Sequence, residues 1–94
     1  MLFEWDEEKA AFNLTKHGVD FASATEAFAD PFAMERFDPR SNAVGEARCL
    51  LTGTGAGALL TVVYTERGES LRIISARRAT RREHDDYYIH NSQA

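Results

Sequence analysis

Two β-rich segments separated by a short turn constrain the fold of this chain more than any other feature. The first, Ala58–Glu66, is apolar at positions that would face both sides of a sheet, which indicates a strand in the sheet's centre. Gly68 and Glu69 then predict a turn. The second segment, Leu71–Ala79, alternates like a strand, with β-branched residues in its middle and cations at its exit. Together these segments predict a long antiparallel hairpin.

The register of this hairpin decides which arginines can share a site. If Arg67 pairs with Ser70 across the turn, Val63 faces Ile74 and Arg78 lies at the far end of the hairpin. About eight residues at roughly 3.3 Å each separate Arg67 from Arg78, or about 26 Å. The two side chains are therefore not expected to serve the same active site.

A helix is expected to begin directly after the second strand. Thr80-Arg81-Arg82-Glu83 matches a capping box, in which the Thr80 hydroxyl accepts from the Glu83 amide and the Glu83 carboxylate accepts from the Thr80 amide. This helix should span Arg81–His90. The junction carries guanidinium groups and tyrosines, a combination that suits a phosphate-bearing partner. These residues are Arg77, Arg78, Arg81, Arg82, Tyr87 and Tyr88.

The N-terminal half predicts an edge strand, Leu2–Trp5, followed by a helix. Asp6 is a good N-cap for this helix, which should run to about Lys16 and end at Gly18. Its apolar and polar residues fall on opposite faces. The expected buried face consists of Ala10, Ala11 and Leu14, and the polar face of Lys9, Asn13 and Lys16.

The remaining elements complete an α+β fold. They are a second helix over Phe21–Ala29 capped by Asp20, strands over Phe32–Phe37 and Arg48–Thr52, a polar loop over Asp38–Gly45 and a glycine-rich hairpin loop over Gly53–Gly57. We therefore expect one domain over residues 1–94, with a mostly antiparallel sheet of about four to five strands. The two N-terminal helices should pack on one face of this sheet, and a third helix should follow the last strand.

Charge is divided unevenly along the chain. The net charge of −4 would by itself argue against nucleic acid, but residues 1–47 hold 4 Lys/Arg against 10 Asp/Glu, whereas residues 48–94 hold 7 against 5. Every base after Lys16 is arginine, which favours bidentate contacts with phosphate or carboxylate groups. No apolar run is long enough to span a membrane, and the single cysteine, Cys49, fits a reducing cytoplasm.

Several motifs along the chain occur together in one known family. They are Phe3-Glu4-Trp5-Asp6, Lys9, Asn13, Lys16-His17-Gly18-Val19, Phe21, Phe28, Asp30-Pro31, Val63-Tyr64-Thr65-Glu66-Arg67 and Arg72-Ile73-Ile74-Ser75-Ala76-Arg77-Arg78-Ala79. By these motifs the sequence resembles the BrnT family of type II toxin–antitoxin toxins, in the RelE-like ribonuclease superfamily. The resemblance implies a RelE-like fold and a small endoribonuclease that inhibits translation.

The resemblance also implies a partner and a set of site residues. A BrnA-like antitoxin, which dimerises and binds DNA, would neutralise the toxin, and a complex with two copies of each chain would bind its own promoter. More distant RelE relatives end their last strand in basic residues and carry a tyrosine on the following helix, positions that match Arg77, Arg78 and Tyr87. Unlike RelE itself, this chain has no paired lysines in the middle strand, where Arg48 is the only base. The expected substrate is therefore RNA, either on the ribosome or free.

Metal-free RNA cleavage needs groups that stabilise a dianionic transition state and groups that move protons. Arg77 and Arg78 are the candidates for the first role, because twist at the strand end could bring both side chains round to one side. The candidates for proton transfer are His17, Lys16, Glu83 and Tyr87. Each also has a structural interpretation. Lys16 and His17 suit a helix C-terminus. The capping box accounts for Glu83, and packing in the core accounts for Tyr87.

Four further arginines are expected to bind RNA or the antitoxin, namely Arg67, Arg72, Arg81 and Arg82. No cofactor is expected. No metal site is expected either, since His84 and His90 are six residues apart and do not share a helix face. A different interpretation is a non-enzymatic interaction module whose arginine-rich face holds an acidic protein partner.

Overall fold

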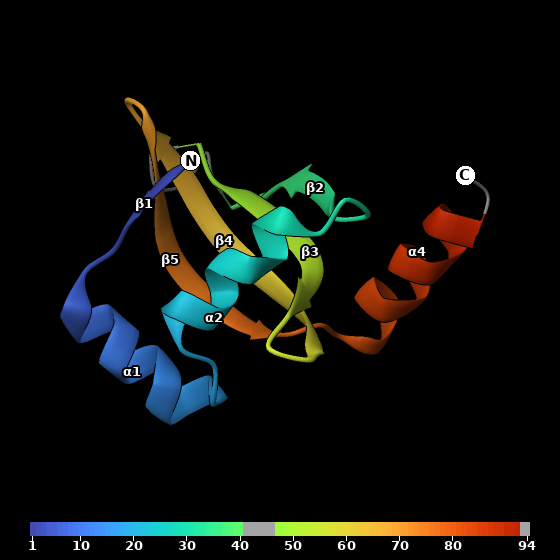
Figure 1. Cartoon of the computed structure of the whole chain (residues 1–94), viewed down its shortest axis with the longest axis horizontal. Coiled ribbons are helices and arrows are strands. Elements are labelled where there is room, and N and C mark those ends of the chain that lie inside the picture. Colours follow the sequence, from blue (N-terminus) through green and yellow to red (C-terminus); the bar gives the residue numbers. More distant parts are fainter. Residues whose placement is uncertain (41–46, 93–94) are drawn as a thin grey trace.

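The computed structural model describes residues 1–40 and 47–92, which form a five-stranded sheet with its helices (Figure 1). In chain order the described elements are β1 (Leu2–Glu4), α1 (Glu7–His17), α2 (Phe21–Glu26), the 3₁₀ turn η1 (Ala27–Ala29), β2 (Met34–Phe37), β3 (Cys49–Gly55), β4 (Ala58–Arg67), β5 (Ser70–Arg78) and α4 (Arg81–Ser92). The strand order in the sheet is β1-β5-β4-β3-β2. In this part of the chain no helix is long and apolar enough to cross a membrane.

The α+β class, the β4–β5 hairpin and the C-terminal helix agree with the sequence analysis. β1 lies at an edge as expected, but it runs parallel to β5, so the sheet is mixed. Antiparallel neighbours can be joined by a short hairpin, whereas most of the chain separates β1 from β5 and leaves their relative direction open. The two N-terminal helices also differ in position: α2 crosses one face of the sheet, whereas α1 lies beside β5 (Figure 1).

Some element boundaries differ from those expected. The second helix changes to a 3₁₀ turn after Glu26, and β2 begins at Met34 rather than Phe32. β3 begins one residue later than expected and extends three residues further, to Gly55. Most of the expected polar loop, residues 41–46, lies outside the described residues.

Gly53 and Gly55 belong to strand β3, which corrects the expected glycine-rich hairpin loop. They allow α2 and η1 to approach the strand closely. A Cβ atom at Gly53 would lie 2.7 Å from the Ala27 carbonyl oxygen, and one at Gly55 would lie 2.7 Å from the Ser23 carbonyl oxygen. The turn itself is Ala56-Gly57, whose φ angles of 50° and 75° match a tight two-residue hairpin turn.

β5 contains one extra residue relative to β4. Tyr64 pairs with Ile73, but Val63 pairs with Ser75, so Ile74 is left in a β-bulge. The expected pairing of Val63 with Ile74 is therefore wrong, and the register is shifted by one residue from this point to the end of the strand. Regular alternation of the sequence gives no sign of such an insertion.

The bulge changes which side chains of β5 face each side of the sheet. Ile73 and Ala76 are both buried in the core under α2, although they are three residues apart. Arg78 pairs with Leu60, a residue of that core, whereas Arg77 pairs with Thr61 on the other face. The two adjacent arginines therefore emerge on opposite faces of the sheet.

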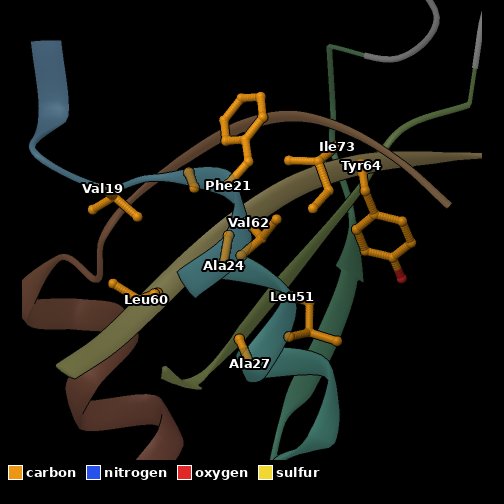
Figure 2. Packing of buried hydrophobic residues seen from close by; sticks show 10 residues of the cluster. Val19, Phe21, Ala24, Ala27, Leu51, Leu60, Val62, Tyr64 and Ile73 are labelled. Atoms are coloured by element: carbon orange, nitrogen blue, oxygen red, sulfur yellow. The ribbon is translucent and has the colours of Figure 1, made fainter. Parts of the chain in front are cut away.

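The hydrophobic core lies between the sheet and the layer of α2 and η1. Figure 2 shows its buried residues from close by. They are Val19, Phe21, Ala24, Ala27, Leu51, Leu60, Val62, Tyr64, Ile73 and Ala76. Small residues on α2 and η1, Ala24 and Ala27, face the strands and let the helical layer lie close to the glycines of β3.

Asn13 is the buried residue of α1, which corrects the expected pattern for this helix. Ala10 packs against the core as expected, but Ala11 is exposed and Leu14 is 49% exposed. The Asn13 side-chain amide donates to the Val19 and Ala76 carbonyls at 2.9 and 2.8 Å and accepts from the Ala76 amide at 3.1 Å. β1 pairs only with Ser70–Arg72, so Asn13 takes the place of a neighbouring strand at Ala76.

We expect Asn13→Ala to lower the free energy of unfolding by about 3 kcal/mol, because it leaves buried backbone groups of Ala76 and Val19 without partners. The control is Leu14→Ala at the next position, which should cost less than about 1 kcal/mol because the side chain is half exposed. Chemical denaturation of both variants measures the difference. Equal losses of stability in the two variants would contradict this role of Asn13 and favour the apolar face expected from the sequence.

Candidate functional site

A groove of about 510 Å³ lies between α1 and the sheet face that α2 leaves open. Its apolar and neutral lining includes Val63, Ile74 and Ser75 from the hairpin. Its basic lining residues are Lys9, Lys16, His17, Arg40, Arg48 and Arg77. We call this surface the basic groove. Among the described residues that line it there is no Asp or Glu, although the whole chain has a net charge of −4.

Lys16 and His17 reach the groove because α1 ends there. Gly18 has φ +71° and its amide donates to the Leu14 carbonyl at 2.8 Å, the glycine helix end expected from the sequence. Lys9 lies about two turns earlier on the same helix face as Lys16. The three basic side chains of α1 thus line one side of the groove.

Arg40 is held by a buried acid at its own side of the groove. Asp38 is 3% exposed and accepts from the Arg40 backbone amide at 3.0 Å and from Nε and Nη2 at 3.2 Å each. These hydrogen bonds from Arg40 hold the pKa of Asp38 below its ordinary value, so Asp38 is ionised at neutral pH. The carboxylate binds the guanidinium group at two nitrogen atoms, although the Arg40 side chain itself is 77% exposed.

Arg77 is positioned by Glu83, the first acidic residue of α4. Its Nη1 and Nη2 donate to the two carboxylate oxygens of Glu83 at 2.6 and 3.1 Å. Arg36 of β2 donates to the same carboxylate. The Glu83 side chain is 8% exposed, whereas that of Arg77 is 32% exposed. One carboxylate therefore holds arginines from two different strands.

Glu83 also completes the capping box expected from the sequence. Its amide donates to the Thr80 hydroxyl at 3.1 Å, and its carboxylate accepts from the Thr80 amide at 2.8 Å. Burial by itself would raise the pKa of Glu83, but the hydrogen bonds from Arg77, Thr80 and Arg36 outweigh it and hold the pKa well below its usual range. At neutral pH the group is a carboxylate and has no proton to donate.

Arg78 lies on the other side of the sheet from the groove. It borders a separate hollow near the start of α2, with Asp20 and Ser23. The expectation that strand twist brings both arginines to one side is therefore not met in this arrangement, because the bulge leaves Arg77 facing the groove and Arg78 facing α2.

Tyr87 is a buried residue of α4 and does not line the groove. It is 6% exposed, and its hydroxyl donates to Asp30 at 2.7 Å. Burial and this hydrogen bond raise the pKa of Tyr87 to about 12. Asp30 also accepts from the Thr54 amide at 2.9 Å, so the tyrosine joins α4 to the segment that precedes β2 and to β3. Tyr88 is 53% exposed, and its ring centre lies 4.7 Å from that of His84 with the two ring planes tilted by 52°.

The other arginines named in the sequence analysis are spread over the surface. Arg67 lies at the turn end of the hairpin, opposite Ser70, as expected. Arg72 is 3.8 Å from Glu4. Arg81 and Arg82 are about nine-tenths exposed and lie 3.4 and 3.9 Å from Asp85 and Asp86, one turn further along α4. None of the four lines the basic groove.

Sequence reasoning named Lys16, His17 and Arg77 and missed three basic residues of the groove: Lys9, Arg40 and Arg48. The seven-residue spacing of Lys9 and Lys16 was the one available signal for Lys9. Arg40 and Arg48 come from the segments flanking residues 41–46, and only the folded chain brings them to α1. Among residues 1–40 and 47–92, no three His, Cys, Asp or Glu side chains gather as a metal site would require.

Residues 5–83 match a family model described as the ribonuclease toxin BrnT of a type II toxin–antitoxin system. A search of curated proteins found no match. The matched segment contains α1, the sheet strands from β2 to β5 and Glu83, and so most of the residues that build the basic groove.

We expect Glu83→Gln to lower the free energy of unfolding by about 2 kcal/mol at pH 7, because glutamine keeps the capping contact but loses the charge that binds two guanidinium groups. The folded-state pKa is depressed, so this contribution is present above the ordinary value of 4.5 and is lost as the pH falls below it. The difference between wild type and variant, measured by denaturation, should therefore be constant from pH 7 to about pH 5 and shrink below that.

The control for this measurement is Asp85→Asn on the same helix. Its carboxylate is 49% exposed and faces a largely exposed arginine, so the loss should be under about 0.5 kcal/mol. An Asp85→Asn variant with the same loss and the same pH dependence would contradict a special role for Glu83.

Proposed function

The chain belongs to the BrnT family of ribonuclease toxins of type II toxin–antitoxin systems, and we propose that it is an endoribonuclease that binds and cleaves RNA in the basic groove. The observation that carries the proposal is the gathering of five Lys/Arg side chains and His17 in one groove of a chain with net charge −4. Asp38 and Glu83 orient two of these side chains, Arg40 and Arg77, and basic side chains gathered on one surface attract the phosphates of RNA.

The proposed reaction is attack of a ribose 2′-oxygen on the adjacent phosphorus. The 2′-hydroxyl gives up its proton, the bond from phosphorus to the 5′-oxygen breaks, and the 5′-oxygen leaves with a proton. The products are a 2′,3′-cyclic phosphate and a 5′-hydroxyl. Negative charge grows on the phosphoryl oxygens in the transition state, so cations fixed beforehand around them lower the barrier.

Arg77 is the residue to which we assign this stabilisation. A guanidinium group has five N–H donors. Glu83 engages two of them, and the Arg78 carbonyl accepts a third at 3.3 Å. The remaining N–H groups are available to a phosphate, and the contact with Glu83 keeps the group from rotating away. Arg78, on the opposite face, is assigned no part in the chemical step.

His17 is the residue to which we assign proton transfer. Histidine is the side chain whose charge ordinarily changes near neutral pH, and His17 lines the same groove as Arg77. Lys16 next to it would stabilise the charge of the substrate. Glu83 and Tyr87 are assigned positioning roles, since Glu83 is ionised and tied to two arginines, and Tyr87 is buried against Asp30.

The family implies an antitoxin partner. We propose that this partner is a DNA-binding dimer that neutralises two toxin copies and binds its own promoter, and that free toxin inhibits translation by cutting RNA. Four arginines outside the groove would serve the partner by raising its association rate. They are Arg67, Arg72, Arg81 and Arg82.

Arg77→Ala should lower the single-turnover rate of cleavage at saturating RNA by about 100-fold or more, because it removes charge stabilisation at the reacting phosphate. Arg78→Ala should lower that rate by less than about threefold, since its side chain lies on the other face. Arg77→Lys keeps the positive charge but removes the planar set of N–H donors. Its rate should therefore lie between those of Arg77→Ala and the wild type.

Equal losses for Arg77→Ala and Arg78→Ala would show that both side chains reach one transition state. If the wild-type chain shows no cleavage but binds an acidic protein through these arginines, the protein is a non-enzymatic interaction module instead. Thermal denaturation of each variant checks that the fold is retained.

Cleavage should proceed at an unchanged rate in excess EDTA, because the cations that stabilise the transition state are side chains of the groove. The 3′ fragments should carry 5′-hydroxyls, and the 5′ fragments should carry 2′,3′-cyclic phosphates or 3′-phosphates. Mass spectrometry of the products reads both ends. Loss of activity on chelation, restored by Mg²⁺, would reject this part of the proposal.

A further inference from the structure

Phe12 is an apolar side chain in an unusual place. It is 67% exposed and lines the basic groove, and it is not part of the hydrophobic core. Exposed single apolar residues are common on protein surfaces. This one, however, lies among basic side chains on the surface to which RNA phosphates would bind.

The neighbours of Phe12 on α1 give it a definite setting. Lys9 precedes it by three residues and Lys16 follows it by four, so all three share one face of the helix. The Lys16 Nζ lies 5.9 Å from the centre of the Phe12 ring, within the range of a cation–π contact. The helix therefore presents an aromatic ring between two ammonium groups to the groove, with Arg77 among the other lining residues.

We infer that Phe12 is a stacking platform for an unpaired base of single-stranded RNA. Sites for single strands combine cations that follow the backbone with aromatic rings on which bases stack. Here Lys9 and Lys16 supply the cations on α1, and Phe12 supplies the ring. The inference rests on the proposed function and deepens it, because it names the substrate as single-stranded RNA.

A duplex cannot use this platform. Its bases are already stacked on their neighbours, and its accessible surface consists mainly of phosphates, sugars and base edges. The cations of the groove would still attract it. Phe12 should therefore contribute to the difference between single-stranded and double-stranded RNA, while the lysines and arginines contribute to the binding of both.

The test measures binding of a fluorescent 2′-O-methyl RNA strand, which cannot be cleaved because its 2′-oxygens carry no proton. Phe12→Ala should weaken binding of the single strand about tenfold, equivalent to about 1.4 kcal/mol, and binding of the matching duplex less than about twofold. Phe12→Trp should keep the affinity of the wild type, and its added indole fluorescence should be quenched by the single strand.

The matched control is Phe37→Ala, which removes the same side chain from β2, where it is 79% exposed and outside the groove lining. It should change neither affinity. An equal effect of Phe12→Ala on single strand and duplex, or an effect no larger than that of Phe37→Ala, overturns the inference.

The outcomes also separate this inference from the proposed function. The inference fails and the function stands if Phe12→Ala binds the 2′-O-methyl strand as the wild type does while the wild type cleaves the same strand with free 2′-hydroxyls. The inference stands and the proposed cleavage fails if binding of the single strand depends on Phe12 but the strand with free 2′-hydroxyls is never cut.

Discussion

The extra residue in β5 is the constraint on which the arrangement of the rest of the sheet depends. With strict alternation from Ile73, Ala76 would point away from α2 and Arg77 would point under it. A guanidinium group buried there would lose its hydration among apolar residues. The bulge at Ile74 instead places the small side chain beneath the helical layer and the charged one on the open face. Core packing and the basic groove are thus two results of one irregularity.

Glu83 connects the sheet to the last helix. The carboxylate caps α4, and through Arg36 and Arg77 it joins that helix to β2 and β5. Two further polar contacts hold α4 in place: Tyr87 bonds to Asp30, and Asn91 donates to the Phe32 carbonyl at 3.3 Å. α4 is therefore attached largely through directional hydrogen bonds. Such contacts define its orientation and, with it, the orientation of Arg77.

The features that the sequence predicted correctly are those fixed by nearby residues. The capping box of Thr80 and Glu83, the helix end at Gly18 and the β4–β5 turn each involve groups a few positions apart. The burial of Asn13 could not be predicted, because its partner Ala76 is 63 residues away and needs a side-chain amide only where β1 stops pairing. The glycines of β3 were misread for the same reason, since the backbone of α2 and η1 that requires them is remote in sequence.

The same distinction between nearby and distant residues applies to the candidate site. The sequence analysis gathered its arginines from one continuous stretch, but the bulge separates Arg77 from Arg78, and α4 points Arg81 and Arg82 to solvent beside acidic neighbours. The groove is assembled from α1, from the segments flanking residues 41–46 and from β5. A sequence shows that basic residues are present, but their meeting depends on the topology of the sheet.

The uneven distribution of charge over this protein affects its association with other molecules. Five of the eleven Lys/Arg residues line the basic groove, and two of these five, Arg40 and Arg77, are paired with the buried acids Asp38 and Glu83. If the groove binds RNA as proposed, its cations would attract the polyanion from a distance and orient the encounter before any contact forms. Under the proposed function, a chain with an acidic pI of 5.3 would thereby bind RNA quickly through one surface and adhere little through the rest.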